Sequence, residues 1–187
     1  MLKLGHRTFA DTDLLVMAIV NRTKDSFYDK GATFAEEKAM ERIRRVVRRG
    51  ADIVDIGGVK AGPGVRVDPE EEIRRTVPLV TKVRAEFPDL VISVDTWRAE
   101  VGRAVCEAGA DLLNDTWGGP DPALPAVAAE FGAGLVCAHA GPLTPRTRPF
   151  RVAYRAVVAD VLEHVLALAA RAVATGVDPA RILIDAA

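Results

Sequence analysis

Short apolar stretches alternate along this chain with longer stretches whose apolar residues recur at helical spacing. The short stretches are almost continuous in Val, Ile and Leu, which is typical of parallel strands buried on both faces. In the longer stretches an apolar residue returns every three or four positions, as Met40, Ile43 and Val47 do. The alternation predicts an α/β domain with a parallel sheet and right-handed crossover helices.

Capping and turn residues set the bounds of these elements. Asp68 and Pro69 are typical of a helix start, and Gly50, Gly109 and Gly176 each follow the last turn of a predicted helix. We expect strands over residues 14–20, 51–58, 90–95, 111–115, 134–139 and 181–185. We expect helices over residues 34–49, 69–86, 98–108, 121–132 and 151–174.

Each predicted strand contains a short apolar run that is followed at once by an amide, a carboxylate or an imidazole. These strand-end residues are Asn21, Asp55, Asp95, Asn114, His139 and Asp185. Parallel strands end at one edge of a sheet, so these side chains project into one mouth, as in a (β/α) barrel. An eight-stranded barrel needs about 250 residues, and this chain has 187. The residues alone therefore allow either an open doubly wound sheet or a barrel shortened to about six strands and five helices.

Composition narrows the class of protein. A length of 187 residues predicts a single domain over the whole chain, and the net charge of -1 gives no basis for binding nucleic acid or an anionic membrane. Apolar runs fall short of the roughly 18 residues of a membrane span, and we expect a cytoplasmic protein without a leader. Cys106 and Cys137 are expected to be buried, reduced thiols rather than a disulfide framework.

Three of the strand-end residues suit recognition of a flat heterocycle. Asp95, Asn114 and Asp185 together offer hydrogen-bond donors and acceptors that match an amino-pyrimidinone edge, such as that of a pterin or guanine. The alternative is that such acids only cap helices, as Asp95 could for the helix near Arg98.

The loops after the first two strands offer further candidates. Asn21 and Asp25 carry oxygen ligands suited to Mg²⁺, although such residues often only form turns. The glycine-rich segment 57–64 is neither a dinucleotide-binding motif nor a P-loop; it is a plain connection, or Lys60 and Arg66 contact a phosphate.

His139 is the one histidine at a predicted strand end, and its role is left undecided. No second His or Cys stands at zinc-ligand spacing from it. His6 lies near the terminus, and His164 is interpreted as a surface or packing residue of the last helix.

Five segments resemble the dihydropteroate synthase family of folate biosynthesis in order and spacing. They are VMAIVNRTKDSF (16–27), DIGG (55–58), SVDT (93–96), AGADLLND (108–115) and ILID (182–185). The likeness is greatest to the divergent second synthase-like proteins of mycobacteria and related actinobacteria.

The resemblance implies a TIM barrel, usually a homodimer, that condenses hydroxymethyl-dihydropterin pyrophosphate with p-aminobenzoate. It implies that Asn21 binds Mg²⁺ near the pyrophosphate and that Asp55 supports the pocket from beneath. Asp95, Asn114 and Asp185 would bind the pterin ring.

Departures from the family pattern fall in the loops and at the end of the chain. Lys24 stands where the family has Pro, and Ala61 and Gly62 replace the Thr and Arg that help organise p-aminobenzoate and pyrophosphate. The last two strands, which carry a Lys, an Arg and a His of the site, are missing after Ala187. We therefore expect a synthase-like transferase whose activity is weak or lost, and whether the chain is an enzyme stays open.

Three other functions remain open. The chain could be a non-catalytic pterin-binding or regulatory homologue, or a methyltetrahydrofolate methyltransferase of the same superfamily. It could also be an inactive fragment with exposed barrel edges.

Overall fold

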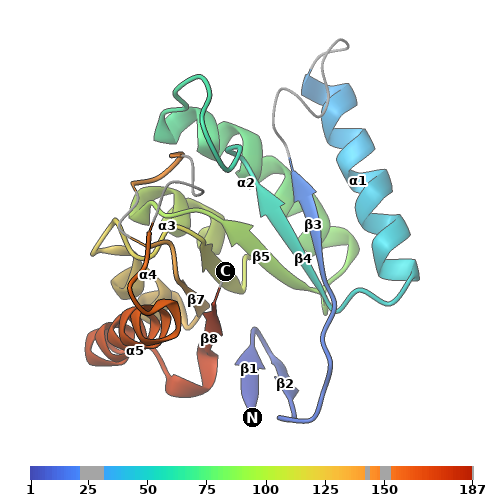
Figure 1. Cartoon of the computed structure of the whole chain (residues 1–187). Helices are drawn as coiled ribbons and strands as arrows, with labels where there is room; N and C mark the ends of the chain where they lie inside the picture. The colour runs from blue at the N-terminus through green and yellow to red at the C-terminus, as the bar shows by residue number, and fades with distance from the viewer. Residues whose placement is uncertain (22–31, 142–143, 148–152, 187) are drawn as a thin grey trace.

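The computed structural model describes residues 1–21, 32–141, 144–147 and 153–186. Six parallel strands form one sheet, shown in Figure 1. They are β3 (Met17–Asn21), β4 (Ile53–Gly57), β5 (Val91–Asp95), β6 (Leu112–Asp115), β7 (Gly134–Ala138) and β8 (Ile182–Asp185). Their order in the sheet is β3-β4-β5-β6-β7-β8, so each strand lies beside the next in sequence. A doubly wound sheet reverses its order at a switch point, so that alternative is wrong and the order is that of a barrel wall.

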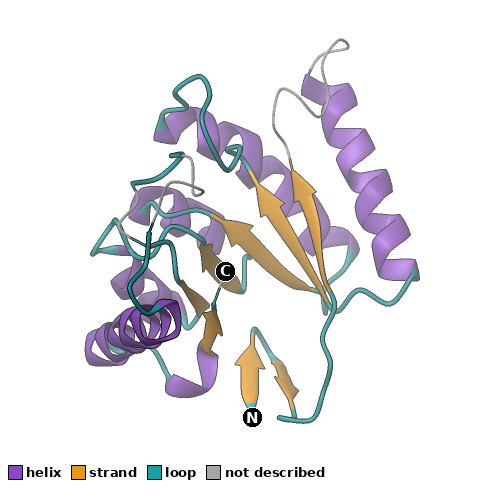
Figure 2. Ribbon diagram, viewed as in Figure 1, coloured by secondary structure: helices purple, strands orange, loops and turns teal. Residues whose placement is uncertain are grey.

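Helices cover one face of this sheet (Figure 2). They are α1 (Ala32–Arg48), α2 (Pro69–Glu86), α3 (Ala99–Glu107), α4 (Leu124–Phe131) and α5 (Val157–Thr175). As predicted, the Asp68 carboxylate accepts a hydrogen bond from the Glu71 N–H at 2.9 Å and caps α2. Outward strand residues pack beneath the helices in the main core; they include Val20, Val54, Ile92, Leu113 and Leu135. Over the described part of the chain, no helix has the length and apolarity to cross a membrane.

The fourth helix starts later than the sequence predicts. Asp121 was expected to open it, yet α4 begins at Leu124. The Asp121 carboxylate instead accepts hydrogen bonds from the N–H groups of Ala99 (2.8 Å) and Ala123 (3.0 Å). Asp121 therefore ties the loop after β6 to the start of α3.

The fifth helix also starts late. The sequence predicts a helix from residue 151, but residues 153–156 are not helical and α5 begins at Val157. Tyr154 lies beside His139, with ring centroids 5.6 Å apart. The irregular backbone of residues 153–156 allows the Tyr154 ring to lie against His139, at the end of β7.

An amino-terminal hairpin, β1 (Leu2–Leu4) paired with β2 (Arg7–Phe9), was not predicted. Its Leu4 and Phe9 side chains enter a second apolar cluster at the amino ends of the strands. That cluster also holds Ile53, Val91, Leu112 and Val136, with Met17 and Leu183 at its margin. Six flat strands would span about 24 Å, too far for two side chains to reach, so the sheet curves around the hairpin.

Candidate functional site

The concave face of the sheet, opposite the helices, carries its side chains in layers. Strand residues alternate between the two faces, and the lowest inward layer is the apolar cluster around the hairpin. Above it, Asp55 lies beside Ser93 in the register of β4 and β5. The top layer is a continuous row of register partners across four strands, namely Asn21, Gly57, Asp95 and Asn114. Three predicted strand-end residues thus share one row, directly above a fourth.

The lower layer is built around the Asp55 carboxylate. Its Oδ1 accepts hydrogen bonds from Ser93 Oγ at 2.6 Å and from Asn114 Nδ2 at 3.2 Å. Asp55 is only 4% exposed, and burial raises its pKa while the two hydrogen bonds oppose the rise. The hydrogen bond from Asn114 Nδ2 to Asp55 fixes the orientation of the Asn114 amide. Its other N–H and its carbonyl therefore keep a defined direction. Asp55 therefore lies beneath Asn114, and its support of a ring pocket, which the family resemblance implies, stays a prediction.

Asp95 occupies the centre of the top layer. Burial and the nearby Asp55 charge raise the pKa of Asp95 to about 8, and Thr116 Oγ1 donates a hydrogen bond to it at 3.3 Å. The Asp95 carboxyl is therefore largely protonated at neutral pH and offers one donor and one acceptor. That pair matches a ring nitrogen next to an amino group.

The capping alternative for Asp95 is not what the structure shows. Arg98 is the N-cap of α3, and its own side chain makes no capping hydrogen bond. The Ala99 N–H at this helix end is instead hydrogen-bonded to the Asp121 carboxylate at 2.8 Å. The Arg98 N–H is hydrogen-bonded to Thr96 Oγ1 at 3.3 Å. Asp95 thus stays available on the concave face.

Asn21 reaches toward Asp95 across Gly57. A Cβ placed on Gly57 would lie 2.6 Å from Asn21 Oδ1 and 3.8 Å from Asp95 Oδ2, so only glycine leaves this space open. Mg²⁺ requires about six oxygen ligands. The described residues hold no group of three His, Cys, Asp or Glu side chains suited to a metal ion. Asp25, the other predicted ligand, lies outside the described residues, and those that are described do not by themselves fit a resident Mg²⁺ ion.

Asp185 ends β8 at the same edge of the sheet, paired in register with Ala138. It alternates with Leu183, whose side chain belongs to the concave-face cluster. Asp185 is exposed, lies two strands from Asn114 and stands one inward position above the row of Asp95. Its part in ring binding stays a prediction.

The glycine-rich loop after β4 is tied to the loop after β7. Arg146 donates hydrogen bonds to the backbone carbonyls of Val65 at 2.7 Å and Gly62 at 3.2 Å. These contacts join positions more than 80 residues apart in the sequence. They fix part of the rim, by which we mean the loops that follow the carboxyl ends of the strands. Lys60, in the same loop, is exposed.

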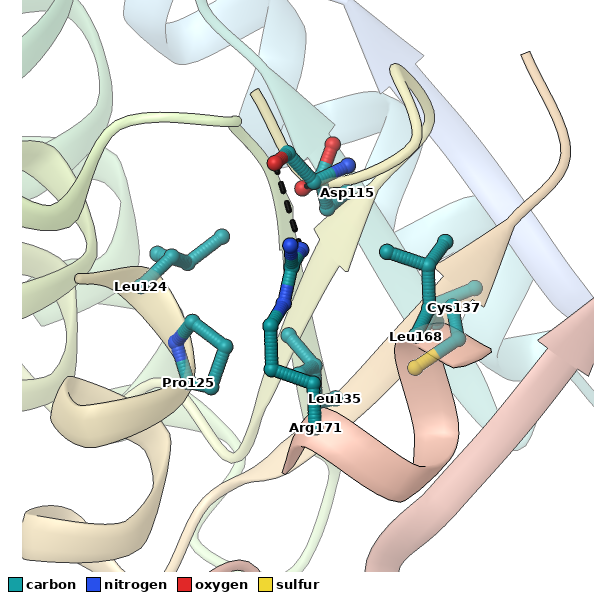
Figure 3. A pocket seen from close by; sticks show the side chains of 9 residues that line it. Asp115, Leu124, Pro125, Leu135, Cys137, Leu168 and Arg171 are labelled. Carbon is teal, nitrogen blue, oxygen red and sulfur yellow. Dashed lines mark hydrogen bonds between the residues drawn. The ribbon is translucent and has the colours of Figure 1, made fainter. Parts of the chain in front are cut away.

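Asp115 faces the helices and not the concave face. It accepts hydrogen bonds from the N–H groups of Trp117 (2.9 Å) and Gly119 (3.0 Å), and burial raises its pKa to about 6. Figure 3 shows the small cavity beside it, where the Arg171 guanidinium donates to the Gly119 carbonyl at 3.2 Å. A volume of about 10 Å³ holds at most about one water molecule, so this is a packing space.

His139 is paired, which its sequence position did not reveal. Its Nε2 lies 2.7 Å from Asp160 Oδ1 on α5, and its ring centroid is 5.7 Å from that of His164. His164 is therefore a packing residue, but one that packs against His139. The sequence gives no signal for Asp160, since it sits among the polar positions of an ordinary helical pattern.

A second pair missed by the sequence is Glu72 with Arg98. Glu72 lies in the first turn of α2, is fully buried and forms an ion pair with Arg98. Arg98 also donates to the Val67 carbonyl at 2.8 Å. Burial raises the pKa of Glu72, and its hydrogen bonds and the Arg98 charge oppose the rise. The pair joins the amino ends of α2 and α3 beside the mouth.

With this geometry established, comparison with known proteins assigns the family. The model of the family described as "Pterin binding enzyme" matches residues 17–187. The chain belongs to this pterin-binding family. It is 60% identical over 185 residues to "Inactive dihydropteroate synthase 2" of Mycobacterium bovis, covering 97% of this chain and 58% of that protein. It is 40% identical over 173 residues to the dihydropteroate synthase of Mycobacterium leprae, covering 91% of this chain and 60% of that protein.

Solved structures agree with this placement in the pterin-binding family. The Xanthomonas albilineans dihydropteroate synthase with 4-aminobenzoic acid matches with a TM-score of 0.82 and 35% identity, over 92% of this chain and 61% of that one. A Mycobacterium tuberculosis protein matches with a TM-score of 0.72 and 45% identity, over 98% and 66%. The chain thus spans about 58% of the Mycobacterium bovis relative. The predicted likeness to divergent dihydropteroate synthases is confirmed, as is the barrel-type fold of six strands and five helices.

Proposed function

We propose that this chain binds a pterin ring on the concave face of its sheet, as a dihydropteroate-synthase-like protein whose synthase activity is weak or lost. The observation that carries the proposal is the buried polar cluster in which Asp55 fixes Asn114 beside Asp95. Two kinds of relative support it. The protein named "Inactive dihydropteroate synthase 2" is 60% identical, and a Xanthomonas albilineans synthase has been solved in complex with 7,8-dihydropteroate.

The ring would be held by its polar edge. The protonated carboxyl of Asp95 donates to one ring nitrogen and accepts from the neighbouring amino group, and Asn114 bonds the next positions along that edge. Asp185 would close the far side. A ring with the wrong order of donors and acceptors leaves these polar groups unpaired and binds poorly.

Turnover as a synthase requires the departing pyrophosphate to be stabilised. Neither Ala61 nor Gly62 has a side chain that can donate a hydrogen bond, and Arg146 is bound to backbone carbonyls of the same loop. A Mg²⁺ ion could reach Asn21 only if substrate phosphates completed its coordination. Stabilisation of the leaving group is therefore weak, which favours binding over catalysis. We further propose a cytoplasmic homodimer.

Isothermal titration with 6-hydroxymethylpterin tests the binding. Asp95→Ala should abolish the heat of binding, because it removes the carboxyl that both donates to and accepts from the polar edge of the ring. Lys60→Ala, on the exposed rim, should leave the affinity within about twofold. Equal effects of the two substitutions would mean that the ring binds elsewhere, and no binding by the wild-type chain would end the proposal.

Synthase activity is measured separately. Wild-type protein is mixed with the pterin pyrophosphate, p-aminobenzoate and Mg²⁺, and pyrophosphate release is followed. We expect a rate close to the uncatalysed background. A rate typical of a working synthase would show that the altered loop does not weaken stabilisation of the leaving group.

A further inference from the structure

The two tryptophans of the chain both lie beside the pterin cluster. Trp97 follows Asp95 by two residues, and Trp117 follows Asp115 by two, on the loops after the neighbouring strands β5 and β6. Their rings meet edge to face, with centroids 6.5 Å apart and an interplanar angle of 79°. Both residues are partly exposed. An aromatic pair of this geometry is attractive beyond its buried area, so the two indoles form a defined surface at the rim.

A buried ion pair holds this surface in place. The Arg98 guanidinium lies over the Trp97 ring, 4.5 Å from its centroid. The same guanidinium is bound to Glu72, which is fully buried, and to the Val67 carbonyl at 2.8 Å. Because Arg98 is fixed from below, Trp97 is held against Trp117 before any ligand arrives. Such preorganisation lowers the entropy that binding costs.

The aromatic pair is also connected to the ring-binding groups. Thr116, next to Trp117 in the chain, donates to Asp95 Oδ1 at 3.3 Å. A pterin whose polar edge lies against Asp95 and Asn114 therefore has the two indoles beside the strand ends that bind it. The part of the ligand that leaves the pocket on this side meets aromatic surface.

Charge on this side of the rim disfavours a phosphate. Arg98 is the only basic residue among residues 96–98 and 116–123, which form the loops after β5 and β6. It is already paired with Glu72 and covered by Trp97. Arg171 of α5 also reaches the loop after β6, where its guanidinium is bound to the Gly119 carbonyl and lies near the Asp115 carboxylate. The nearby acids Asp95 and Asp115 would repel a pyrophosphate further whenever they are ionised.

We propose that Trp97 and Trp117 form an aromatic wall that selects pterins with a flat ring substituent, such as an aminobenzoyl group, over pterins with a pyrophosphate. This inference rests on the proposed function, since it requires that a pterin binds at the cluster. It makes the two tryptophans determinants of specificity.

Calorimetric titration of the wild-type chain with three ligands tests the wall. Pteroic acid carries the aminobenzoyl group, 6-hydroxymethylpterin carries neither group, and its pyrophosphate carries the charged one. We expect pteroic acid to bind about tenfold more tightly than 6-hydroxymethylpterin and the pyrophosphate to bind no more tightly than it. Pteroic acid should also quench the tryptophan emission, because both tryptophans of the chain belong to the wall.

Substitutions assign the preference to the wall. Trp97→Ala and Trp117→Ala should each weaken pteroic acid about fivefold to tenfold and leave 6-hydroxymethylpterin within about twofold. Trp97→Phe keeps a flat ring and should retain most of the preference. Phe131→Ala is the matched control, because it removes a ring that lies under Arg103 at 5.6 Å, at the far end of α4. It should change neither affinity.

The outcomes separate the two proposals. If pterins bind the wild type without preference, or if the tryptophan variants weaken both ligands equally, the wall is refuted and pterin binding stands. A preference for the pyrophosphate also refutes the wall. If no pterin binds, the proposed function fails and the wall fails with it. The wild-type titrations decide every case except the one that compares variants, and Trp97→Phe serves for that case if an alanine variant does not fold.

Discussion

Replacing Asp95 by Asn removes a titrating group from the most perturbed position of the cluster. The pKa of Asp95 is raised from 3.8 to about 8, chiefly by burial and then by the charge of Asp55. At pH values between 3.8 and about 8, Asp95 keeps its proton in the folded chain but has released it in the unfolded chain. The contribution of Asp95 to stability is therefore complete below about pH 4 and is lost as the pH rises through 8.

The size of the effect follows from the same shift. A difference of roughly four pKa units bounds the loss at about 6 kcal/mol. Asp95 is partly exposed, so water screens a small part of the penalty, and we expect about 5 kcal/mol, which still keeps the carboxyl protonated at neutral pH. Asn has nearly the same shape and still accepts the hydrogen bond from Thr116. Asp95→Asn should therefore match the wild type at pH 4 and exceed its stability by about 5 kcal/mol at pH 9.

Urea unfolding followed by tryptophan emission at several pH values between 4 and 9 measures this difference. Acids far from Asp95 titrate in both proteins and cancel from the comparison. Asp55 interacts with the Asp95 charge, so its change in titration is part of the measured difference. Asp185→Asn, at an exposed strand end, is the control and should show no growing difference with pH. A stability difference between Asp95→Asn and wild type that stays constant within about 0.5 kcal/mol from pH 4 to pH 9 would refute the reasoning.

Three further predictions concern packing and thiol chemistry. Leu4→Ala should lower the free energy of unfolding in urea by about 3 kcal/mol, because Leu4 is fully buried. Leu14→Ala, at 96% exposure, is the control and should lower it by under about 0.5 kcal/mol. Similar losses for the two variants would mean that the hairpin is not docked. Glu72→Ala leaves the partly buried Arg98 guanidinium without its carboxylate partner and should lower the unfolding free energy by about 3 kcal/mol, and Glu72→Gln by less. The reverse order would argue against the ion pair. Burial raises the thiol pKa to about 12 for Cys106 and about 11 for Cys137, so neither should react with Ellman's reagent at pH 8 until urea is added. Rapid reaction of the folded protein would show that these thiols are accessible.

The concave cluster could be predicted because it follows from strand ends. Asp55 and Asn114 stand 59 positions apart in the sequence, yet the repeat of apolar runs that end in polar residues places them together. The register of a parallel sheet converts equal positions on successive strands into a row in space. The same argument places Asp185 on the correct face, but a strand-end pattern cannot give the distance between side chains.

The contacts that were missed depend on helices or on very short strands. Three-residue strands carry too little periodicity to predict the hairpin of residues 2–9. The pairs Glu72 with Arg98 and His139 with Asp160 each join a helix to a loop or strand end, and helix rotation is set by core packing rather than by a local motif. The contact between Trp97 and Trp117 could not be predicted, because no rule of sequence spacing relates the loop after β5 to the loop after β6.

The amino-terminal hairpin has a consequence for the order in which the chain folds during synthesis. Lys3 forms a salt bridge with Asp178 at 3.7 Å, and Arg181 donates to the Gly5 carbonyl at 3.4 Å. The hairpin thus waits during synthesis for partners made more than 170 positions later. Until β7 and β8 emerge, the cluster that buries Leu4 and Phe9 is incomplete, and a chaperone that binds short apolar segments could bind these residues on the nascent chain.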